Sequence, residues 1–199
     1  MENELWFRPL VWTDYRLALL FTILIPLILL IWAYVQKVEA IQRLLIIYWR
    51  VASLVVITLY LMIAAIPVGF VSSFLCRILI PLSLWFWVDV NEEIDDLSPR
   101  PLKLALTAWR WAITIYCILS SLALIPFLPC AFSSEIIKTP FCQVWFEAPW
   151  LYKAYFHANS KPQFLGFLGI LALIIYGFSL SYFVLIRLGK QGRSAMQQW

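Results

Sequence analysis

The sequence predicts an all-α protein, a polytopic bundle of transmembrane helices that crosses a lipid bilayer five times. Hydrophobic residues make up 63% of the chain and charged residues 13%, whereas an average soluble domain carries roughly 45–50% apolar and about 25% charged residues. Several apolar stretches reach the roughly 20 residues that a helix needs to span a bilayer. Several of the 11 Trp, 9 Tyr and 14 Phe residues flank these stretches, as expected for rings at the headgroup level. We therefore expect residues 1–199 to form a single transmembrane domain.

Five stretches, taken in chain order, are the predicted spans. They cover residues 17–35, 44–66, 70–88, 104–128 and 164–186. The segment before the first span mixes acidic, basic and aromatic residues and lacks a basic n-region, so we expect no cleavable signal peptide. The third span contains Arg77 near its middle and Pro81 beyond it. Its alternative is a re-entrant hairpin, which would leave four spans.

The distribution of basic residues favours five spans. One face of the membrane then receives Lys37, Arg43, Arg100, Lys103, Arg187, Lys190 and Arg193, and the other receives Arg8, Arg16, Lys138, Lys153 and Lys161. Cytoplasmic segments carry the denser Lys and Arg, so the amino end is expected outside and the carboxyl end inside. Four spans would instead mix dense and sparse basic ends on one side.

The predicted outer loop, residues 129–163, carries two of the four cysteines. Cys130 and Cys142 are a candidate disulfide, because disulfides persist in oxidising compartments outside the cytoplasm. Cys76 and Cys117 lie within predicted spans and are interpreted as small apolar residues. No C-x-x-C spacing is present, so no metal site is predicted. The many aromatic residues of this loop predict that it lies along the membrane surface.

The predicted inner loop, residues 89–103, is strongly acidic at its start. Five carboxylates stand within eight residues: Asp89, Glu92, Glu93, Asp95 and Asp96. Such a density favours Mg²⁺ or Ca²⁺, but the predicted spans contain no further acidic residue for a second half of a metal site. We therefore expect a solvated loop, or an acidic interaction patch that pairs with Arg50, Arg100, Lys103 and Arg110.

Three arginines inside the predicted spans are candidate contacts for lipids or partner proteins. Arg50 and Arg110 lie about two turns from the basic face, where a side chain can reach the interface. Each is interpreted as an interfacial anchor, with a clamp on a lipid phosphate or carboxylate as the alternative. Arg77 lies deeper, where a charge costs about 3 kcal/mol or more. No acidic residue of a predicted span can neutralise it, so Arg77 is the best single candidate for a functional residue.

Two further features have mainly structural interpretations. His157 is the only histidine and is interpreted as an interfacial polar residue, since no second strong ligand for a haem stands nearby. The last span contains Gly166, Gly169, Gly177 and Ser181. Small residues let helices approach closely in membranes, either within the bundle or between two molecules.

Several distinctive segments resemble an uncharacterised cyanobacterial family of multi-pass membrane proteins, a domain-of-unknown-function family. They are residues 2–10 (ENELWFRPL), 37–50 (KVEAIQRLLIIYWR), 85–96 (WFWVDVNEEIDD) and 153–166 (KAYFHANSKPQFLG). The resemblance covers essentially the whole chain. It implies a host with thylakoids, and hence a thylakoid or plasma membrane of a cyanobacterium. It implies no activity, cofactor or catalytic residue.

The leading functional prediction is a non-catalytic integral membrane protein. It would be an accessory or assembly factor that binds other integral membrane proteins, lipids or pigments of a photosynthetic or respiratory membrane. No catalytic motif is present, and no cofactor is predicted beyond a bound lipid or pigment. The net charge of +4 includes no basic run of the kind that binds nucleic acid. The alternatives are a small oligomeric transporter or channel for an anion, with Arg77 attracting the anion, and a metal-dependent lipid-modifying enzyme that uses the acidic loop.

Overall fold

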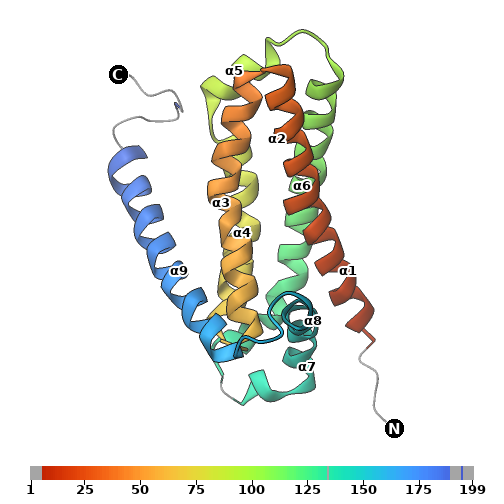
Figure 1. Cartoon of the computed structure of the whole chain (residues 1–199), viewed down its shortest axis with the longest axis vertical. Helices are drawn as coiled ribbons and strands as arrows, with labels where there is room; N and C mark the ends of the chain where they lie inside the picture. Colours follow the sequence, from red (N-terminus) through yellow and green to blue (C-terminus); the bar gives the residue numbers. More distant parts are fainter. Residues whose placement is uncertain (1–5, 134, 189–193, 195–199) are drawn as a thin grey trace.

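Five long helical segments run between the two ends of the molecule in the computed structural model, which describes residues 6–133, 135–188 and 194 (Figure 1). They are Arg8–Gln36, Glu39–Ile63, Val68–Trp85, Pro101–Ala131 and Pro162–Ile186. Each is long and apolar enough to cross a membrane. The predicted all-α membrane bundle with five spans is therefore confirmed for the described part of the chain. Lys190, Arg193 and residues 1–5 lie outside the described residues, as does the side chain of Arg187.

The elements follow in a simple order. The first span comprises α1 (Arg8–Ala18), the π-helical turn η1 (Leu19–Leu24) and α2 (Ile25–Gln36). Next come α3 (Glu39–Ile63), α4 (Val68–Trp85), α5 (Val88–Asp95) and α6 (Pro101–Leu124). A group of short helices then includes η2 (Ile125–Ala131), η3 (Ile136–Lys138), α7 (Pro140–Gln143), η4 (Val144–Phe146) and α8 (Glu147–Phe156). The chain ends with α9 (Pro162–Tyr182) and η5 (Phe183–Arg187).

The first span begins earlier than the predicted residue 17. Helix α1 starts at Arg8, with Pro9 in its first turn, a position where proline's missing N–H has no partner to lose. Asp14 therefore belongs to the first spanning helix, although its charge excluded it from the predicted apolar stretch. The third span is a continuous helix through Pro81, so the re-entrant hairpin is not the structure adopted.

Both predicted loops are more ordered than expected. Residues 88–95 of the acidic inner segment form helix α5, because Val90 and Ile94, four residues apart, are buried against the bundle. At the opposite end, η2, η3, α7, η4 and α8 form a unit that we call the cap (Figure 1). Trp145 and Phe146 of the cap are buried, and Phe146 packs edge-on against Phe70 of α4, so part of the cap packs into the end of the bundle.

Two apolar clusters hold the bundle together. The larger one joins α2, α3, α4, α5 and α6 around fully buried residues such as Leu44, Tyr48, Leu84 and Ile113. The smaller one joins the cap to α1, α3, α4 and α6. Because the second cluster exists only when the cap is in place, the cap is part of the folded bundle.

Helix α9 is attached differently from the other spans. Of its residues, Leu165, Gly166 and Gly169 are the buried ones. A Cβ at Gly166 would collide with Cβ of Ala64 in the connection after α3, and one at Gly169 would lie 3.2 Å from the backbone nitrogen of Leu61. The amino end of α9 therefore packs tightly against the end of α3, and from there α9 diverges from α3 towards its carboxyl end (Figure 1).

This attachment predicts opposite effects of the same substitution at two glycines. Gly166→Ala is expected to lower the free energy of unfolding by about 1–3 kcal/mol, because the added methyl group overpacks the contact with Ala64. Gly177→Ala is the matched control, since its Cβ would meet no atom within 4 Å, and it is expected to be neutral or stabilising by up to about 1 kcal/mol. Thermal unfolding in detergent measures both. Equal stabilities would contradict the close contact at Gly166.

Candidate functional site

A groove opens between α3, α4 and α9, where α9 diverges from the rest of the bundle. Its volume is about 1170 Å³. Its walls are mostly aliphatic and aromatic, and they include Ile46, Ile57, Leu79, Ile175, Tyr176 and Phe183. Tyr176 of α9 donates a hydrogen bond across the groove to the carbonyl oxygen of Val51, at 3.4 Å. Since α9 is the least buried of the five spans, the groove is open towards the surroundings of the bundle.

Two arginines of α3 line this apolar groove. Arg43 and Arg50 both face it, because seven residues are close to two helical turns and place both side chains on one side of α3. The Arg43 guanidinium donates to the Glu93 carboxylate of α5 at 3.0 Å. Arg50 is exposed, and its side chain forms no ion pair with any residue that the structure describes. Arg50 therefore offers a positive charge inside a largely apolar groove.

Arg77 has the acidic partner that the sequence did not predict. Its Nη2 donates to Oδ2 of Asp14 on α1 at 2.5 Å, and its Nε donates to Oγ of Ser120 on α6 at 3.1 Å. Its Nη1 donates to the carbonyl oxygen of Ser73 at 3.1 Å and also contacts the Ser73 hydroxyl. Tyr116 donates to Oδ1 of Asp14 at 3.0 Å. The expectation of an unneutralised arginine was wrong because Asp14 lies on the first helix.

Arg110 is buried in the bundle and does not anchor at the interface. Its relative exposure is 4%, and its guanidinium carbon stacks 4.0 Å from the ring centre of Trp85. It donates to the carbonyl oxygen of Leu84 at 3.1 Å and to Oδ1 of Asn91 at 2.7 Å. Arg110 therefore ties α6 to the end of α4 and to α5, because its position on α6 faces inward beside the buried Trp109.

The acidic residues of α5 do not converge on a common point. Among the described residues, no three His, Cys, Asp or Glu side chains form a group that could hold a metal ion. Glu93 pairs with Arg43, whereas Lys103 donates to the backbone oxygens of Asp95 and Leu97 at 2.6 and 2.8 Å. The expected pairing of the acidic patch with Arg50, Arg100, Lys103 and Arg110 is not found among the described ion pairs. Glu92, Glu93, Asp95 and Asp96 are exposed, and the side chain of Asp89 accepts a hydrogen bond from Ser194 at 2.9 Å.

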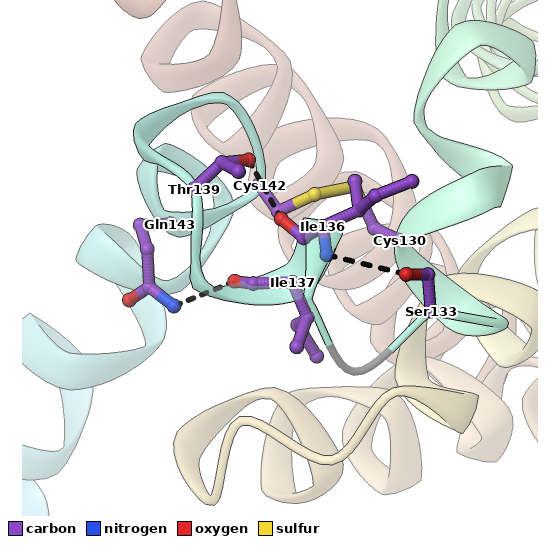
Figure 2. Close-up of a disulfide and its surroundings, with 7 residues drawn as sticks. All are labelled: Cys130, Ser133, Ile136, Ile137, Thr139, Cys142 and Gln143. Carbon is purple, nitrogen blue, oxygen red and sulfur yellow. Dashed lines mark hydrogen bonds between the residues drawn. A yellow bond between two sulfur atoms is a disulfide. The ribbon is translucent and has the colours of Figure 1, made fainter.

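A disulfide closes the cap. It joins Cys130 and Cys142, and Figure 2 shows three hydrogen bonds around it. These bonds link Ile136 N–H to Ser133 Oγ, Thr139 Oγ1 to the Ile136 oxygen, and Gln143 Nε2 to the Ile137 oxygen, at 3.3, 2.6 and 2.7 Å. The bridge therefore fixes a segment that contains only short helical turns.

Polar contacts fasten the cap to the bundle. Glu147 accepts hydrogen bonds from Arg8 at 3.0 Å and from Trp12 at 2.9 Å, both on α1. Tyr15 donates to the Trp145 oxygen at 2.6 Å. His157, just after α8, lies 3.0 Å from the Tyr60 hydroxyl of α3. These contacts position the cap over the end of the bundle where α1 begins.

The sequence model of a family described as "Protein of unknown function (DUF3177)" matches residues 8–196. The chain belongs to the DUF3177 family. No curated protein and no solved structure matches it. The groove, the buried Asp14–Arg77 pair and the cap are therefore interpreted from the geometry of this DUF3177 protein itself.

The sequence contained a signal for Asp14 but none for the groove of the DUF3177 protein. Pro9 near the start of the chain is a helix-start signal, and extending the first helix back to it would have included Asp14. The groove depends on the angle at which α9 leaves α3, which no local pattern specifies. Arg43, predicted only as a basic residue of the inner face, lines the groove beside Arg50.

Proposed function

We propose that this DUF3177 protein is a non-catalytic integral membrane protein whose groove takes up an elongated apolar or amphipathic molecule, a lipid or a pigment. In this proposal it is an accessory or assembly factor for other integral membrane proteins. The observation that carries the proposal is the groove between α3, α4 and α9. Its volume of about 1170 Å³ exceeds the roughly 300–1,000 Å³ of most ligand pockets, and its walls suit a hydrocarbon ligand.

The proposed location is a thylakoid or plasma membrane of a cyanobacterium, as the sequence resemblance implies. The proposed orientation puts the cap outside and α5 on the cytoplasmic side. Two observations support it. Lys37 ends α2, and Arg43 and Lys103 lie near the starts of α3 and α6. These helix ends lie at the α5 end of the bundle (Figure 1), in agreement with the positive-inside rule, and the disulfide lies at the other end.

The two alternative functions receive less support from the geometry. An anion channel that uses Arg77 would need an arginine free to attract the anion, whereas the Arg77 charge is balanced by Asp14 at 2.5 Å. A metal-dependent lipid-modifying enzyme would need convergent carboxylates, and no three potential metal ligands form a group among the described residues. The uptake of a lipid or pigment by the groove meets no comparable conflict with the geometry.

A photoreactive amino acid in the groove tests the proposal. Placed at Ala172, which lines the groove, it is expected to form an adduct with a lipid, a pigment or another membrane protein in native membranes. The matched control is Ile115, a 54% exposed residue at a similar depth on α6 and outside the groove. Mass spectrometry of the two products measures the difference. Identical adducts at both positions would show only bulk lipid and would contradict the proposal.

A second measurement tests the accessory role. Purification of the wild-type protein in a mild detergent is expected to retain proteins of a membrane complex in fixed proportion. Retention that a groove-filling substitution such as Ala172→Phe leaves unchanged, or a complete absence of co-purifying membrane proteins, would argue against the accessory role.

A further inference from the structure

We propose that the occupant of the groove is an anionic phospholipid of the leaflet at the α5 end, with its phosphate at Arg50 and its acyl chains between α3, α4 and α9. This inference rests on the proposed function and names the ligand class of the same groove. Three features of the groove support the ligand class: its length, its closed end towards the cap and its charge.

The length of the groove matches that of one phospholipid. On α3 the lining residues extend from Arg43 to Ile57, about 21 Å at 1.5 Å per residue. Half of a bilayer, with its headgroup region, is about 20–22 Å thick. A phospholipid whose phosphate is reached by the extended side chain of Arg50 can therefore place its acyl chains along the groove towards Ile57.

The closed end of the groove, towards the cap, argues against a transmembrane helix as the occupant. A partner helix crosses the whole bilayer and would need a groove about 30 Å long, whereas the groove covers about 21 Å of α3. Here the backbone of α9 at Gly166 and Gly169 lies directly against Ala64 and Leu61. Because α9 diverges from this contact (Figure 1), the groove widens towards the arginines. This taper suits a lipid, whose headgroup lies at the wide end.

The charge inside the groove selects an anion. Arg43 already donates to Glu93 at 3.0 Å, so Arg50, exposed and about 10 Å nearer the cap along α3, is the lining cation available to a ligand. Its long side chain can extend towards the interface, and a guanidinium matches a phosphate with two parallel hydrogen bonds. Ser53, one turn away and also lining the groove, adds a hydroxyl. None of the described residues that line the groove carries a carboxylate, so the cationic group of a zwitterionic headgroup would find no partner in the groove.

Native mass spectrometry of the full-length protein in lipid-free detergent tests this inference. The protein is titrated with phosphatidylglycerol and with phosphatidylcholine of identical acyl chains. The wild type is expected to bind phosphatidylglycerol about tenfold more tightly, the size of one charge-assisted contact. Arg50→Gln is expected to lose most of this preference, and Arg50→Lys to keep part of it. Arg16→Gln, an exposed arginine on α1 away from the groove, is the matched control and should keep all of it.

A groove-filling variant separates the proposed function of the groove from the proposed anionic ligand. Ala172→Phe is expected to weaken the binding of both lipids, and Leu171→Phe, a neighbouring position outside the groove, is its control. Equal binding of both lipids by the wild type, with Ala172→Phe weakening both, would overturn the anionic ligand and leave the groove function standing. Lipid binding that Ala172→Phe leaves unchanged would overturn both. Equal melting temperatures of the variants exclude misfolding as the cause.

Discussion

Replacing Arg77 by leucine is expected to lower the free energy of unfolding of this protein by about 3–5 kcal/mol, the cost of breaking a buried ion pair from one side. The Arg77 and Asp14 side chains are only 12% and 15% exposed. Without the guanidinium, the Asp14 carboxylate would keep only the hydroxyl of Tyr116 among its described partners. Ser73 and Ser120 would also lose a donor. Unfolding of the purified protein in detergent measures the loss.

A double variant shows whether the loss comes from the unpaired charge. Asp14→Asn combined with Arg77→Met removes both charges and keeps similar side-chain volumes, and it is expected to recover more than half of the stability lost in Arg77→Leu, because a neutral replacement of a buried pair is often tolerated. Arg16→Leu, an exposed position two residues from Asp14, is expected to change little. A double variant no more stable than Arg77→Leu would contradict the pairing. A stable double variant that fails in the cell would instead give Arg77 a functional role.

The Asp14–Arg77 pair also shows why the sequence predicted the bundle better than its interior. The number of helices, their membrane-spanning character and the charged ends of the bundle follow from the lengths and compositions of the segments along the chain. The pairing of Asp14 with Arg77 depends on two residues 63 positions apart. The charge of Asp14 argued against placing this residue in a span. The cost of burying that charge is offset only by Arg77, which lies on another helix. Arg110 is a similar case, because the Trp85 ring that covers it comes from α4.

The groove illustrates a different limit of prediction from sequence. The last span contains three glycines that favour close approach. Gly166 packs against the connection after α3 and Gly169 packs against α3, whereas a Cβ built at Gly177 has no atom within 4 Å. The composition of α9 is compatible with tight packing along its length. Its divergence is set by the cap, which fixes where α9 starts, and by the tight contact at Gly166. Both are tertiary features. The sequence could therefore place Arg50 near the interface, but it could not predict the groove beside Arg50.

Loss of the cap disulfide is expected to have the second large effect. The bridge joins residues 12 positions apart, and closing a loop of about this length stabilises a fold by about 3 kcal/mol in the chain-entropy description. The variant Cys130→Ser, Cys142→Ser is expected to lose about this amount in detergent without a change in the helical content of the five spans. Addition of a reductant to the wild type should reproduce the loss, and addition to the double variant should have no effect. A wild type that responds to reductant no more than the variant would contradict the bridge as a stabilising element.

The same disulfide makes a prediction about orientation, since disulfides persist on the oxidising side of a membrane. The exposed Asn159, between the cap and α9, and the exposed Ser98, between α5 and α6, lie at opposite ends of the bundle. In right-side-out vesicles, Asn159→Cys is expected to react with a membrane-impermeant thiol reagent, and Ser98→Cys only after permeabilisation. The buried Cys76 and Cys117 should stay unreactive in both. The reverse pattern would place the bridge in a reducing compartment and Arg50 in the outer leaflet, so it would remove the positive-inside argument and move the proposed lipid site to the other side.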